Sequence, residues 1–90
     1  MKTLERVWDD SEEMRERVRN FAKTYSPSYD PKRWTDEVFE AIRTGTPPLA
    51  LWRVVAKTQT VGHLLAQPLH THAGKPFLFV HQAAHDGPRD

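Results

Sequence analysis

The histidines in the second half of the chain are the residues whose types and spacing best suit chemistry. His70 and His72 stand two apart, so an extended segment places both imidazoles on one side, and His81 or His85 would add a third ligand. Such a cluster suits zinc or nickel. Residues 41–85 contain no Asp or Glu to hold the rings in position, however. We therefore expect these histidines to be solvent-exposed and predict no metal site, with His70 and His72 as the alternative.

Nucleophilic and acid–base chemistry has little support in the sequence. The three serines lie at a predicted helix start or beside a proline, and none occupies a Gly-x-Ser-x-Gly turn. The adjacent carboxylates Asp9-Asp10, Glu12-Glu13 and Asp36-Glu37 lie near predicted helix starts, where the helix dipole favours negative charge. The chain has no cysteine, which excludes disulfides, thiolate catalysis and cysteine-ligated zinc. We predict no catalytic residue.

Charge is unevenly distributed along the chain. Residues 41–85 carry basic side chains but no acidic ones. This composition is expected if that half forms mainly strands. Alternatively, it indicates contact with a phosphate, a nucleic acid or an acidic protein surface. Lys32-Arg33-Trp34 and Trp52-Arg53 combine basic and aromatic residues, as nucleic-acid binders do. The formal net charge is only +1, far below the excess typical of such proteins. Nucleic-acid binding is therefore a minor alternative.

Length and hydropathy limit the class of protein further. Ninety residues correspond to one domain, residues 1–90. No run of about 18 apolar residues could span a membrane. The N-terminus lacks the apolar segment of a signal peptide. We expect a cytoplasmic protein with no membrane association.

Two helices are predicted in the helical half of the domain, at about residues 10–45. Asp10 is placed to cap the first, which we expect over about 11–25, with Glu13 three residues later as in a capping box. Pro27 and Pro31 interrupt the chain. Thr35 is placed to cap the second helix, and Gly45 to end it.

A β-meander is predicted over about residues 49–82, followed by a frayed tail over 86–90. Its strands are expected at 49–56, 60–67 and 77–81, with a turn over 70–76 and with Pro68 marking a bulge or an edge. Residues 2–8 are either a further strand or a tail. The expected core contains the large apolar residues Phe21, Tyr25, Phe39, Trp52, Leu64, Phe77 and Phe79. The fold class is therefore α+β, with two helices packed on a small antiparallel sheet.

This order of elements resembles the N-terminal half of a GNAT-type N-acetyltransferase. In that family a helical pair precedes a strand, a turn and a valine-glycine strand, and Val61-Gly62 matches the last of these. The resemblance covers nearly the whole chain as topology. It implies a Gly-rich loop that binds coenzyme A after the third meander strand, but the sequence ends at Asp90, where that loop would begin. It therefore implies a truncated fold without its cofactor loop, and no family residue is carried over.

Truncation at this point would leave the strand around Phe77–Val80 at a sheet edge. The first strand, a second copy or another protein could cover that edge by strand pairing, and we predict a homodimer or a tight complex with another protein. We predict an interface that includes Tyr29, Trp34, Phe77 and Phe79. The leading hypothesis is a non-catalytic protein-interaction module without a cofactor, such as a phage or mobile-element regulator of a host enzyme. The alternative is an acyltransferase that uses a coenzyme A thioester and completes its site by dimerisation.

Overall fold

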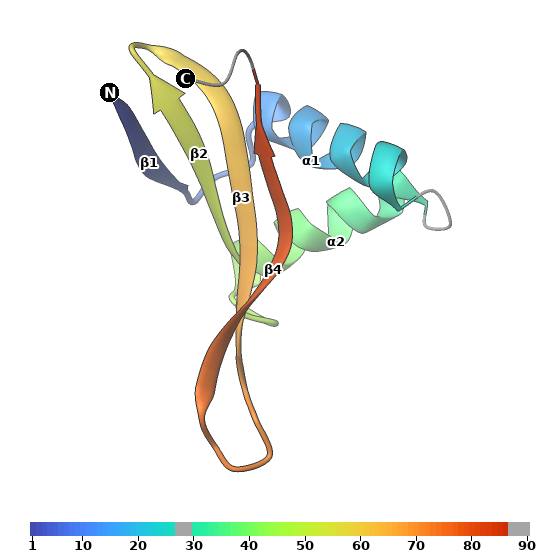
Figure 1. Cartoon of the computed structure of the whole chain (residues 1–90). Coiled ribbons are helices and arrows are strands. Elements are labelled where there is room, and N and C mark those ends of the chain that lie inside the picture. Colours follow the sequence, from blue (N-terminus) through green and yellow to red (C-terminus); the bar gives the residue numbers. More distant parts are fainter. Residues whose placement is uncertain (27–29, 87–90) are drawn as a thin grey trace.

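The chain folds into two helices and a four-stranded antiparallel sheet, as seen in a computed structural model that describes residues 1–26 and 30–86. The sheet order follows the chain, β1-β2-β3-β4, and both helices lie on one face of the sheet (Figure 1). The strands are β1 (Lys2–Val7), β2 (Ala50–Ala56), β3 (Gln59–His70) and β4 (Pro76–His85). The predicted α+β class is confirmed, and residues 2–7 are a strand.

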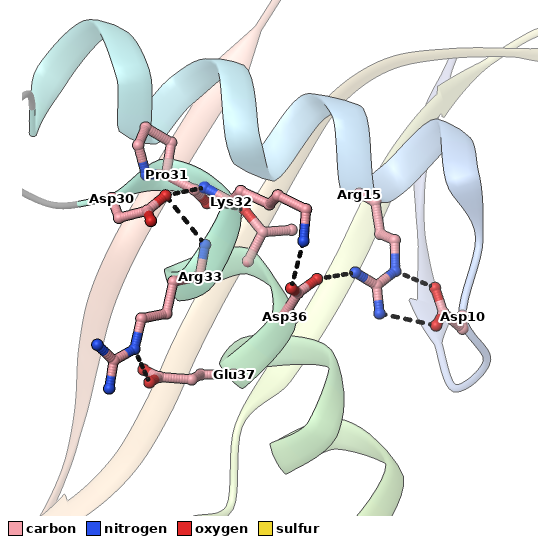
Figure 2. Close-up of polar contacts among 9 residues, drawn as sticks. Asp10, Arg15, Asp30, Pro31, Lys32, Arg33, Asp36 and Glu37 are labelled. Carbon is pink, nitrogen blue, oxygen red and sulfur yellow. Dashed lines mark hydrogen bonds and ion pairs between the residues drawn. The ribbon is translucent and has the colours of Figure 1, made fainter.

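Helix α1 (Glu12–Tyr25) begins at an N-cap other than the expected one. The side chain of Ser11 accepts a hydrogen bond from the Met14 amide at 3.4 Å. Asp10 instead pairs with Arg15, which also reaches Asp36 at 2.6 Å (Figure 2). The Arg15 hydrogen bond lowers the pKa of both carboxyl groups. Arg15 therefore connects the two helices while Asp10 pairs with the same guanidinium, and the predicted capping role of Asp10 was wrong.

Helix α2 (Pro31–Thr44) begins four residues before the predicted cap at Thr35. The Asp30 carboxylate accepts from the amides of Lys32 and Arg33 at 3.1 and 3.3 Å (Figure 2). Pro31 suits the first helical position, because the amide hydrogen that it lacks would have no helical partner there. Thr35 is buried within the helix. Gly45 ends α2, as predicted, and it adopts φ of 79°.

The core lies between the helices and the covered sheet face, and it is built mainly from medium-sized apolar residues. Its buried members are Val7, Met14, Val18, Val38, Phe39, Leu51 and Leu65. Among the aromatic residues expected there, Phe39 is buried, whereas Phe21 and Trp52 are half-buried. Tyr25, Phe77 and Phe79 are exposed, so their predicted core positions were wrong.

The hairpin formed by β3 and β4 is longer than the sequence predicted. β3 continues to His70 and β4 to His85, so His81 and His85 lie on a strand. Pro68 lies in the part of β3 that no longer pairs with β2, so the predicted edge is confirmed; the bulge lies elsewhere, between the pairs Leu65↔Gln82 and Ala66↔Val80. Asp86, expected in a frayed tail, donates its amide to the Val61 carbonyl at 2.6 Å. Residues 87–90 lie outside the described part of the chain.

Candidate functional site

The two edges of the sheet differ in their chemistry. β1 carries charged side chains at Lys2, Glu5 and Arg6. Charged residues discourage an edge strand from pairing with another chain. β4 contains no Asp, Glu, Lys or Arg from Pro76 to His85. The predicted edge position of the strand around Phe77–Val80 is confirmed, and β1 does not cover it because β1 pairs with β2 at the opposite edge.

The distal part of the hairpin forms a two-stranded arm. β2 begins at Ala50, which pairs with Ala66. From residue 67 to the turn, β3 therefore pairs with β4 alone. We call residues 67–80 the arm; it projects beyond the first residue of β2, Ala50 (Figure 1). The turn at its tip is closed by hydrogen bonds between Thr71 and Lys75, and Gly74 adopts φ of 80°.

The arm exposes four consecutive large apolar residues. Phe77, Leu78, Phe79 and Val80 are 44%, 53%, 48% and 48% exposed. Side chains alternate between the two faces of a strand, so the phenylalanines lie on one face of the arm, and Leu78 and Val80 lie on the other. An exposed apolar run of this kind is typical of an interaction surface.

A hollow lies where the arm joins the helices. It has a volume of about 360 Å³, and its lining includes Phe21, Trp34, Phe79 and His81. The ring centroids of Trp34 and His81 are 6.4 Å apart, and those of Phe79 and His81 are 4.7 Å apart. The His81 Nε2 lies 3.0 Å from Gln67 Oε1, and desolvation lowers the pKa of His81. The structure thus brings two predicted interface residues, Trp34 and Phe79, to one hollow.

The remaining predicted site residues do not gather there. Phe77 lies further out on the arm, and Tyr29 lies outside the described residues. His70 ends β3 and His72 lies in the turn, both exposed. Within residues 1–26 and 30–86, no group of three or more His, Cys, Asp or Glu side chains is placed to hold a metal ion.

Three of the residues considered for nucleic-acid binding, Lys32, Arg33 and Trp52, make contacts within the protein. Lys32 and Arg33 form ion pairs with Asp36 and Glu37 one helical turn later, at 3.2 and 3.4 Å (Figure 2). The guanidinium of Arg6 lies 5.1 Å from the centroid of the Trp52 ring. These contacts partly neutralise the positive charge on α2 and cover part of the indole.

A buried histidine forms a second polar feature, which sequence reasoning missed. His63 is 2% exposed, and its Nε2 lies 2.7 Å from Gln82 Oε1. Gln82 in turn donates from Nε2 to the Val18 carbonyl at 3.1 Å. That carbonyl can only accept, so the Gln82 oxygen must face His63, and His63 must donate from Nε2. This chain of hydrogen bonds connects β3, β4 and α1.

Burial favours the neutral form of His63. Desolvation lowers its pKa below the ordinary histidine value, and the hydrogen bond to Gln82 acts in the opposite direction. In the neutral ring Nδ1 is then an acceptor, and it has no partner among the described residues. The Phe21 ring stands edge-on to His63 at 5.8 Å. The only sequence signal for this site was a polar residue within the apolar segment 61–66.

A shallow cavity of about 480 Å³ lies beside His63. Its rim includes Glu13, Arg17 and Asp86. Arg17 forms an ion pair with Asp86 and donates to the Thr60 carbonyl at 2.9 Å, and the Thr60 hydroxyl donates to Glu13 at 2.8 Å. The hydrogen bond from Arg17 lowers the pKa of Asp86. These contacts hold the end of β4 against α1, which is a structural role.

Comparisons with known proteins provide no relative from which a function could be transferred. No family model matches the chain, and neither a curated protein nor a solved structure matches it significantly. Neither of the helices in the described part of the chain is long and apolar enough to cross a membrane. The β4 edge, the arm and the hollow are therefore the features of the molecule that indicate its function.

Proposed function

We propose that this protein is a small non-catalytic interaction module that binds and modulates another protein through the edge of β4. The observation that carries the proposal is the contrast between the β1 edge, with its Lys, Glu and Arg side chains, and the β4 edge, which has no Asp, Glu, Lys or Arg and exposes four apolar residues. Main-chain groups of an exposed edge can pair with an added strand, and neighbouring pockets can select its side chains. The hollow beside Trp34 and Phe79 supplies such a pocket.

Two matched substitutions test this proposal. Leu78 and Leu4 are similarly exposed, at 53% and 59%, but they lie at opposite edges of the sheet. In a pull-down, Leu78→Lys is expected to lose a stoichiometric partner that wild type and Leu4→Lys both retain. Hydrogen exchange should show that this partner protects the β4 amides. Equal retention by both variants, or protection confined to β1, would refute the proposal.

The coenzyme A alternative is tested in the same preparation. A ligand that binds only the folded protein raises its melting temperature. Under the interaction hypothesis, acetyl-CoA leaves the melting temperature unchanged. A saturable increase with acetyl-CoA would favour the acyltransferase alternative.

A further inference from the structure

We propose that the protein paired at the β4 edge is a second copy of this chain, antiparallel along Pro76–Val80 with a twofold axis at Leu78. This inference rests on the proposed use of the β4 edge for strand pairing, and it assigns that edge to a second copy instead of a different protein. Pairing of β4 with β1 of another copy would join two different surfaces and leave both outer edges free to add further copies. Pairing of β4 with β4 closes the assembly at two chains, and it leaves the charged β1 strands outermost.

The sequence of the arm is self-complementary in this register. Phe77 of each copy lies opposite Phe79 of the other, and Leu78 lies opposite Leu78. Cross-strand aromatic pairs stabilise antiparallel sheets, whereas like charges placed opposite each other destabilise them. Pro76–Val80 contains no charged side chain, so the pairing brings no like charges together.

The β4 bulge favours a short pairing centred on Leu78. The register skips His81 between Val80 and Gln82, and a bulge of this kind ends regular pairing along an edge. An axis at Leu78 pairs all five residues before the bulge. An axis at Val80 would carry the bulge into the ladder, and an axis at Phe77 would place Phe79 opposite charged Lys75.

Self-pairing would also join the two strands of each arm to the two strands of the other. A two-stranded hairpin is marginal in water, and three or more strands are needed for independent stability. Two arms joined in this way form a four-stranded ribbon. The ring of Phe77 from the second copy then lies beside Phe79, at the rim of the hollow that Trp34 and His81 line.

Cysteine crosslinking tests the register, because the chain has no cysteine of its own. In the proposed dimer, Leu78→Cys places two thiols directly opposite each other, within the spacing of a disulfide. Val80→Cys is the matched control on the same face. Its two thiols would be about four residues apart along the strands, or roughly 13 Å. Under mild oxidation, Leu78→Cys should form a covalent dimer, and Val80→Cys should not unless it is mixed with Pro76→Cys.

Light scattering supplies an independent measurement. Wild type and Leu4→Lys should have twice the mass of the 10.4 kDa chain. Leu78→Lys should raise the dimer dissociation constant at least about tenfold, because it places two lysines opposite each other. A monomeric wild type at high concentration, or crosslinking of Val80→Cys alone, would overturn the inference. If the monomer still captures another protein in a manner that depends on Leu78, the proposed function survives and only the identity of its partner is wrong.

Discussion

Replacing Gln82 with leucine should destabilise the fold more than its position near a sheet edge suggests. Gln82 is 3% exposed and makes two hydrogen bonds, one with His63 and one with the Val18 carbonyl. Leucine has a similar size but offers neither a donor nor an acceptor. The substitution therefore leaves a buried ring nitrogen of His63 facing an apolar group, whichever tautomer the ring adopts.

The size of the effect follows from these two contacts. A buried polar group left without a partner costs about 1–3 kcal/mol, and loss of the hydrogen bond to Val18 adds about 1 kcal/mol. The expected loss of unfolding free energy in Gln82→Leu is therefore about 2–4 kcal/mol. For a domain of this size, 1 kcal/mol corresponds to about 4–8 °C in melting temperature. Urea titration and thermal melts followed by circular dichroism would measure both quantities.

A double-mutant cycle separates the hydrogen bond from general packing losses. His63→Leu alone leaves the Gln82 oxygen unpaired, whereas His63→Leu with Gln82→Leu removes both polar partners. The double variant should cost less than the sum of the single variants by at least about 1 kcal/mol. Additive costs, or a Gln82→Leu cost below about 0.5 kcal/mol, would refute a stabilising hydrogen bond between His63 and Gln82.

Three further predictions concern other contacts of the fold. The pKa values of His63 and His81 are lowered in the folded chain, so below pH 6.5 the unfolded chain binds more protons than the folded one. The free energy of unfolding should therefore decrease as pH falls below 6.5 and level off above it. The slope of melting temperature against pH should be smaller in His63→Leu. Gly62→Ala should destabilise the pairing of β3 with β4, because an added Cβ would lie 2.3 Å from the Ala84 carbonyl oxygen; hydrogen exchange in β4 should increase, and unchanged exchange would contradict this. Arg15→Ala should lower the melting temperature slightly at low salt and less at 0.5 M NaCl, since its ion pairs are exposed to solvent; a difference that does not depend on salt would show that packing dominates.

The helices and the sheet could be predicted because their signals are local. Apolar periodicity and Gly45 identified the extent of α1 and the end of α2. The start of α2 was placed too late because proline was interpreted only as a helix breaker. At the first turn proline is favourable, and Asp30 directly before Pro31 was the available signal for a cap.

The candidate sites were harder to predict because they depend on which residues the strand register brings together. Aromatic residues were assigned to the core by type, yet Phe77 and Phe79 lie where β3 and β4 have no other neighbour in the sheet. The bond between His63 and Gln82 joins positions 19 residues apart. It depends on the bulge in β4, which no local pattern revealed.

The arm itself provides the strongest physical reason to expect an assembly. Ordering a residue's backbone costs about 1–2 kcal/mol in conformational entropy, and apolar burial normally compensates for it. In the single chain, residues 68 and 70–80 are exposed, so the outer arm gains little from burial. Strand pairing at Pro76–Val80 would supply both the missing hydrogen bonds and apolar contact for the exposed phenylalanines. If the arm has this role, hydrogen exchange at Phe77–Val80 should slow as the protein concentration increases, while exchange in β1 should remain unchanged.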